Sequence, residues 1–91
     1  MSLLWVDDLR PPPNDSWVWV KTSREAINEL DTTAGIDCMS LDHDLGGDDT
    51  TRPIVLWLCE NPGNWPDQVR CHSANPVGRE WIEKMCERYA P

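Results

Sequence analysis

Residues 38–47 read CMSLDHDLGG: four residues typical of a buried strand, then two acids around a histidine, then two glycines. Acidic residues and glycine are depleted in strand interiors, so a strand here is expected to end before Asp42. In an open parallel sheet, ligands bind beyond the carboxyl ends of the strands. Because polar residues follow directly on apolar ones, this stretch predicts a strand with a functional site at its tip.

Two other apolar stretches end in a similar way. Leu3–Val6 runs into two aspartates, and Gln68–Cys71 runs into His72 and Ser73. Both histidines of the chain therefore follow predicted strands. We expect the polar ends of these strands to face one crevice, where they offer carboxylates, two imidazoles and a hydroxyl.

The remaining segments predict an α/β order. Trp17–Val20 is a further strand-like segment, and helical spacing with capping signals predicts helices over about 23–30, 52–60 and 76–89. The prolines at 11–13 remove amide donors and fix φ, which predicts a stiff connector between the first two strands. This order favours a small, mostly parallel four-stranded sheet flanked by helices, with right-handed crossovers.

Length and charge limit the class of function. A chain of 91 residues with six tryptophans and no phenylalanine is expected to form one domain, 1–91, in which a few large rings carry much of the core. The net charge of −8 argues against membrane binding and non-specific nucleic-acid binding, because both need clustered Lys and Arg. Without a long apolar segment or an export signal, the chain is expected to be cytoplasmic.

Three motifs carry a resemblance to a known family: residues 4–11 (LWVDDLRP), 40–46 (SLDHDLG) and 72–80 (HSANPVGRE). An acidic pair after the first strand, an aspartate after the third and a hydroxyl after the fourth resemble the receiver domains of response regulators. The motifs together are similar to a divergent branch, the cyclic-phosphate-processing receiver domains. Because the first receiver helix, the fifth strand and its lysine are missing, the resemblance implies a truncated, flavodoxin-like receiver fold.

The resemblance also implies an activity on a cyclic phosphate, either of a nucleotide or of an RNA 2′,3′-cyclic end, in bacteria and their viruses. Opening a cyclic phosphodiester with water needs a base and an acid, and imidazoles suit both roles. His43 and His72 are therefore the candidate catalytic pair of a cyclic phosphodiesterase, a hydrolase. Asp42 or Asp44 is expected to orient one imidazole, and which histidine is the acid stays open.

The phosphate needs partners of its own in so acidic a chain. The candidates are a hydroxyl, an amide and two guanidiniums: Ser73, Asn75, Arg79 and Arg10. The start of a helix presents unpaired amides to an anion, and arginine binds one with two hydrogen bonds. This scheme requires no cofactor. A receiver-like Mg²⁺ site at Asp7, Asp8 and Asp42 is an additional candidate, since hard cations prefer carboxylate oxygens.

Other classes of function stay open. The chain could instead be a non-catalytic module that binds a nucleotide, or an inhibitor that docks on a host protein in the cytoplasm of a bacterium or of a virus-infected cell. A phosphoacceptor switch at Asp42 is less favoured, because the receiver lysine is missing. An exposed sheet edge predicts pairing with a second copy or a partner protein. Trp17 or Trp65 is the candidate for stacking on a base, whereas the other tryptophans are expected in the core.

Overall fold

Four short strands form the sheet in the computed structural model, which describes residues 2–91. They are β1 (Leu3–Val6), β2 (Trp17–Val20), β3 (Cys38–Leu41) and β4 (Gln68–Cys71). Their order across the sheet is β2-β1-β3-β4, and all three neighbouring pairs are parallel. The predicted four-stranded α/β fold is therefore confirmed, with β2 and β4 as its edge strands.

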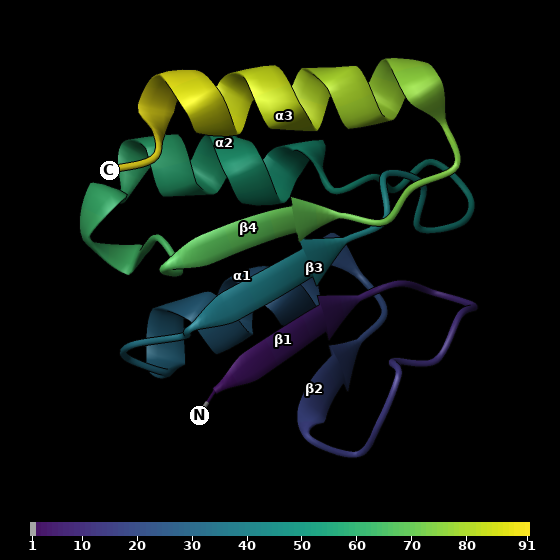
Figure 1. Ribbon diagram of the computed structural model, residues 1–91, viewed down its shortest axis with the longest axis horizontal. Helices are drawn as coiled ribbons and strands as arrows, with labels where there is room; N and C mark the ends of the chain where they lie inside the picture. The colour runs from purple at the N-terminus through teal and green to yellow at the C-terminus, as the bar shows by residue number, and fades with distance from the viewer. Residues whose placement is uncertain (1) are drawn as a thin grey trace.

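Three helices follow the second, third and fourth strands (Figure 1). They are α1 (Ser23–Thr32), α2 (Arg52–Glu60) and α3 (Pro76–Tyr89), and a 3₁₀ turn, η1 (Pro62–Asn64), leads from α2 into β4. Two of them begin with the expected caps: the hydroxyl of Thr22 accepts the amide of Glu25 at 3.1 Å, and the side chain of Asn75 caps α3. The side chain of Thr51, at the start of α2, makes no cap hydrogen bond. Among residues 2–91 no helix is both long and apolar enough to span a bilayer.

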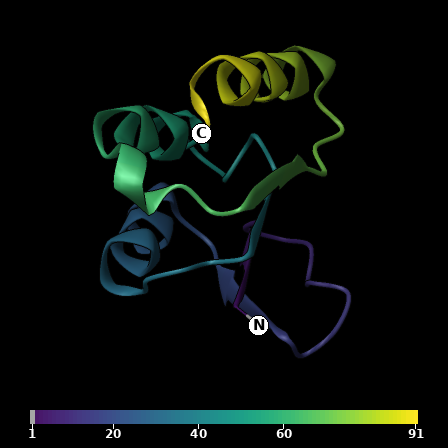
Figure 2. The same ribbon diagram turned by 60° about the vertical axis from the view of Figure 1, so that its left-hand side comes forward.

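Handedness places α1 and α2 on one face of the sheet, and α3 packs against the same core through Ile82. The connections from β2 to β3 and from β3 to β4 run in the same direction across the sheet, so right-handed crossovers put their helices on the same side. The connection from β1 to β2 runs in the opposite direction, and it carries the proline-rich connector, residues 7–16. Figure 2 shows α1 and α2 to one side of the sheet and this connector to the other.

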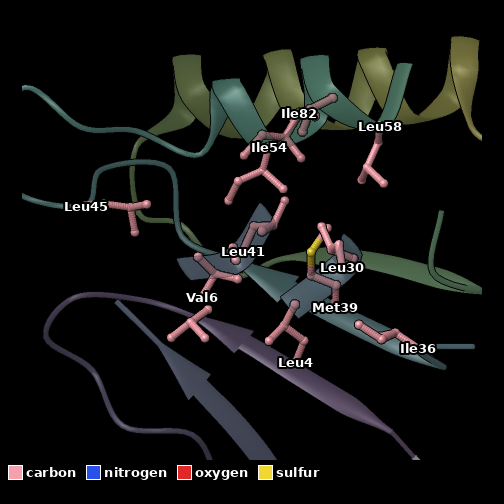
Figure 3. Close-up of a cluster of buried hydrophobic side chains, with 13 residues drawn as sticks. Leu4, Val6, Leu30, Ile36, Met39, Leu41, Leu45, Ile54, Leu58 and Ile82 are labelled. Atoms are coloured by element: carbon pink, nitrogen blue, oxygen red, sulfur yellow. The ribbon is translucent and has the colours of Figure 1, made fainter. Parts of the chain in front are cut away.

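The hydrophobic core lies between the sheet and the helices (Figure 3). Side chains alternate between the two faces of a strand, and Leu4 and Met39 are among those that point toward the helices. Both are at most 1% exposed, and they pack in the same cluster as Ile54 of α2 and Ile82 of α3. The core therefore holds the strands in place from one side only.

The opposite face of the sheet, called the open face below, carries no helix among the described residues. It presents the other strand residues: Leu3, Trp5, Trp17, Trp19, Cys38, Ser40, Gln68 and Arg70. Trp19 was expected in the core but is 36% exposed, because the second strand lies at the edge of the sheet. The open face thus brings aromatic and polar side chains together beside the strand tips.

Candidate active site

The carboxyl ends of three strands place polar residues in one row. The amide of Asp42 donates to the carbonyl of Val6, and the amide of His72 donates to the carbonyl of Leu41, both at 2.9 Å. These bonds continue the parallel ladder one residue beyond the strands. Asp7, Asp42 and His72 therefore occupy neighbouring positions in the row, as expected for strand tips that meet at one edge.

His72 is held on three sides. Its Nε2 lies 3.0 Å from Oδ2 of Asp7, and its Nδ1 lies 2.7 Å from Oγ of Ser40. The ring stacks on Trp5 with centroids 3.9 Å apart and planes 5° apart. A carboxylate only accepts, so Nε2 carries a proton, whereas a hydroxyl can either donate to Nδ1 or accept from it. The imidazole can thus be neutral or protonated without turning.

Asp7 is a buried carboxylate, 2% exposed. Its Oδ1 accepts the backbone amides of Leu9 and Arg10, both at 2.9 Å. Burial raises the pKa of Asp7, but the two amides and His72 outweigh burial and hold the pKa below the ordinary value of 3.8. The side chain is therefore ionised at neutral pH, and Oδ2 retains a lone pair beyond its bond to His72.

Asp7, Asp8 and Asp42 form an acidic cluster. One carboxylate oxygen of each lies within 4.8 Å of the others. Gly46 makes room for this arrangement: it adopts φ +85°, and a Cβ there would come within 2.8 Å of Oδ2 of Asp8. A buried carboxylate beside two others fits a hard divalent cation such as Mg²⁺. The candidate metal ligands named from the sequence are thus brought together.

Arg10 is the candidate phosphate ligand that lies at this cluster. Its Nη1 donates to the backbone carbonyl of His72 at 3.3 Å, on the exposed side of the site. The contact joins the connector to the loop after β4. A guanidinium at this position offers further donors to an anion bound beside His72.

His43 belongs to a different cluster. Its Nδ1 lies 3.1 Å from Oδ1 of Asp44, and its Nε2 accepts from Nε of Arg52 at 2.9 Å. The ring is buried under α3, where a Cβ on Gly78 would overlap it. Side chains alternate along extended chain, so the residue after Asp42 turns toward the helices. Within residues 2–91 the two imidazoles share no hydrogen-bond partner. Contrary to the expectation from the sequence, the structure does not place them across one pocket.

The other candidate phosphate ligands have local partners. Oγ of Ser73 accepts the amide of Asn75 at 3.1 Å, and Oδ1 of Asn75 accepts two amides of the first turn of α3. Arg79 pairs with Glu83 at 3.4 Å on the surface. Nδ2 of Asn75 donates to Asp44, and this bond, followed by that of His43, holds the pKa of Asp44 below 3.8. These residues form a helix cap that supports the His43 cluster.

Several partners of the site were missed from the sequence. They are Ser40 and Trp5 beside His72, the Asp7 carboxylate as the partner of that histidine, and Arg52 beside His43. Alternation along the strands carries part of this signal, since Trp5 and Asp7 must share a face. The pairing register of the strands, which places them beside Ser40 and His72, cannot be predicted from neighbouring residues in the sequence.

The fold and the site define a receiver-type domain: a parallel sheet with acids after β1 and β3 and polar residues after β4, and with no fifth strand within residues 2–91. The family model of the cyclic-phosphate processing receiver domain matches residues 2–88, and the chain belongs to that family. Comparisons with curated proteins and with solved structures gave no match. The name of this family implies a role in cyclic-phosphate processing.

Proposed function

We propose that the domain hydrolyses a cyclic phosphodiester at the acidic cluster, with His72 as its acid–base residue. The observation that carries the proposal is the 3.0 Å contact between Nε2 of His72 and Oδ2 of Asp7, made beside two further carboxylates. Family membership supports a cyclic phosphate as the class of substrate, and our proposal takes it to be that of a nucleotide or an RNA end. His43 is assigned a structural role, because its ring is buried against Gly78 of α3, on the helix side of the sheet and away from the acidic cluster.

The chemistry requires two proton transfers. The oxygen of water bonds to phosphorus, and one of the two ester bonds that close the ring breaks. Protonated His72 donates its Nε2 proton, which is hydrogen-bonded to Asp7 before the reaction, to the leaving oxygen and keeps the Nδ1 proton, for which the hydroxyl of Ser40 is the acceptor. Nε2 then regains a proton from solvent, because the ionised carboxylate of Asp7 favours a proton at that position. The proton lost by water passes to Asp8 or Asp42, and exchange with solvent then restores both groups.

The charge of the substrate must also be balanced. A phosphodiester anion beside three carboxylates would be repelled. A divalent cation held by Asp7, Asp8 and Asp42 would neutralise these charges and polarise the phosphoryl oxygens. Arg10 adds a positive group next to His72, and the flat face of Trp5 keeps the imidazole in one orientation.

The direct test is turnover of 2′,3′-cyclic and 3′,5′-cyclic nucleotides and of cyclic dinucleotides, each with and without Mg²⁺. His72→Gln is expected to lower kcat/KM about 10²- to 10⁴-fold, the usual contribution of a general acid or base. His43→Gln is the matched control and should change kcat/KM by only a few-fold once the folded fraction is taken into account.

The outcomes separate the possible functions. An equal loss in the two variants, with both folded by circular dichroism, would favour the paired-histidine scheme over the one proposed. Stoichiometric binding of a nucleotide with no product formed would identify a binding module instead. The absence of turnover and binding with all these compounds would contradict the proposed function.

A further inference from the structure

A pocket lies on the open face of the sheet, against the connector. It encloses about 420 Å³ and is lined by Pro11–Pro13, Asn14, Asp15, Trp17 and Trp19. Sites for small molecules typically enclose about 300–1,000 Å³. Its lining residues come from β2 and from the loop that joins β1 to β2, two segments that lie side by side in Figure 1. The pocket is therefore large enough for a nucleobase and is built from one continuous segment of chain.

A row of rings connects this pocket to the proposed site. Trp17 meets Trp5 edge to face, with centroids 5.6 Å apart, and Trp5 stacks on His72 at 3.9 Å. The separation between the rings of Trp17 and His72 cannot exceed the sum of these two distances. One mononucleotide can span such a gap, with its phosphate at His72 and its base at Trp17.

The walls of the pocket are held in place before any ligand binds. The indole N–H of Trp5 donates to the carbonyl of Arg10 at 2.8 Å, and that of Trp19 donates to the carbonyl of Asp7 at 2.7 Å. The three prolines restrict the backbone between these anchors. A rigid pocket loses little entropy on binding, which favours a small flat ligand.

The chemistry of the lining favours a base with an amino group. Trp17 is half-buried, whereas Lys21 already lies over the ring of Trp19, 4.5 Å from its centroid. The carboxylate of Asp15 is exposed and makes no hydrogen bond within residues 2–91. A carboxylate can only accept, so it suits the exocyclic amino group of adenine, guanine or cytosine. Bases stack readily on tryptophan.

We propose that this pocket binds the nucleobase of the cyclic phosphate, with the base stacked on Trp17 and its amino group donating to Asp15. The inference rests on the proposed function for the position of the phosphate. It makes the substrate a cyclic nucleotide or a terminal nucleotide of RNA, and excludes a sugar cyclic phosphate that lacks a base as the preferred substrate.

Another cavity of the open face adjoins this pocket, because Trp17 lines both. It encloses about 480 Å³, and most of its other lining residues lie at or just before the amino ends of the strands: Leu3, Asp37, Cys38, Asp67 and Gln68. Cys38 is about 13 Å from Asp42 along an extended chain, so a base at those strand ends would be too far from the strand tips for one nucleotide. The ring of Trp17, which the two cavities share, is linked to His72 through Trp5.

The test compares adenosine 2′,3′-cyclic phosphate with methyl riboside 2,3-cyclic phosphate, which lacks a base. The unmodified protein is expected to prefer the nucleotide by about tenfold or more in kcat/KM, the usual range for one stacked base. Trp17→Ala should bring this ratio toward one, and Trp17→Phe should keep most of it. Val18→Ala is the control, because its side chain lies on the other face of β2, and it should leave the ratio unchanged.

A binding experiment separates this inference from the proposed hydrolysis. Adenosine alone should shift the NMR signals of the Trp17 and Trp19 indole N–H groups, and Asp15→Asn should reduce the preference for adenosine over uridine. These shifts in a protein that hydrolyses no cyclic phosphate would support the base pocket while contradicting the hydrolysis. Equal kcat/KM for the two substrates, with no shift of either indole signal, would overturn the base pocket and leave the hydrolysis standing.

Discussion

The indole of Trp5 and the imidazole of His72 lie parallel, with their ring centroids 3.9 Å apart. The same indole is tied to the connector by its N–H, which donates to the carbonyl of Arg10 at 2.8 Å. One buried ring thus orients the candidate acid–base residue and anchors the loop that carries a candidate phosphate ligand. Stability and activity are therefore expected to be coupled at this position.

Trp5→Ala should lower the free energy of unfolding by about 3–5 kcal/mol, because it removes a large buried ring and leaves a cavity. Trp5→Phe keeps an aromatic face beneath His72 and loses the indole N–H, so it should cost less. Urea unfolding followed by circular dichroism measures both. Equal losses in the two variants would show that the stacked face contributes nothing beyond the hydrogen bond.

Asp7 should make the protein sensitive to acid. Its pKa is lowered in the folded state, so its ionised form stabilises the fold above the ordinary value of 3.8, and this contribution is lost as pH falls through the lowered pKa. The difference in unfolding free energy between the unmodified protein and Asp7→Asn should therefore shrink as pH falls below the ordinary value and through the lowered pKa. Urea titrations across this range measure the difference. A difference that does not vary with pH would contradict the assigned shift.

Divalent cations should stabilise the folded protein through the acidic cluster. A ligand at 100 times its Kd adds about 2.7 kcal/mol to stability, so saturating Mg²⁺ should raise Tm by several degrees in a domain of this size. Asp8→Asn should remove most of the rise, because it deletes one of the three clustered carboxylates. Asp48→Asn, an exposed acid outside the cluster, is the control. An equal rise in all three proteins would indicate non-specific screening.

Gly78→Ala should destabilise the protein, although alanine is the better helix former by about 1 kcal/mol. The added Cβ would overlap the buried imidazole of His43, and overpacking of this kind costs about 1–3 kcal/mol. Gly63→Ala is the matched control, since a Cβ there meets no atom within 4 Å. Thermal unfolding of the two variants measures the contrast. A neutral Gly78→Ala would mean that α3 does not press on His43.

Much of the fold follows from local sequence. Short strand-like runs locate the strands, three of which are followed by acids or histidine, and the capping signals of Thr22 and Asn75 start α1 and α3 where they are observed. The proline triplet correctly predicts a connector between β1 and β2, where receiver domains have a helix. Each of these features depends on neighbouring residues and on backbone preferences that act within a few positions. The helix α1 continues two residues beyond the expected end at Leu30, as helix ends often do.

The candidate site follows from local sequence only in part. The row of polar residues at the strand tips is foreseeable, since parallel strands end at a common edge. The partners of His72 are not, because Asp7 precedes it by 65 residues and Ser40 by 32. Strand pairing and right-handed crossovers bring these segments together. Alternation along the chain turns His43 away from the acidic cluster, and the packing of α3 then buries its ring. Local patterns therefore supply the strands, helices and reactive groups, whereas the pairing register, a long-range property, determines which of those groups meet.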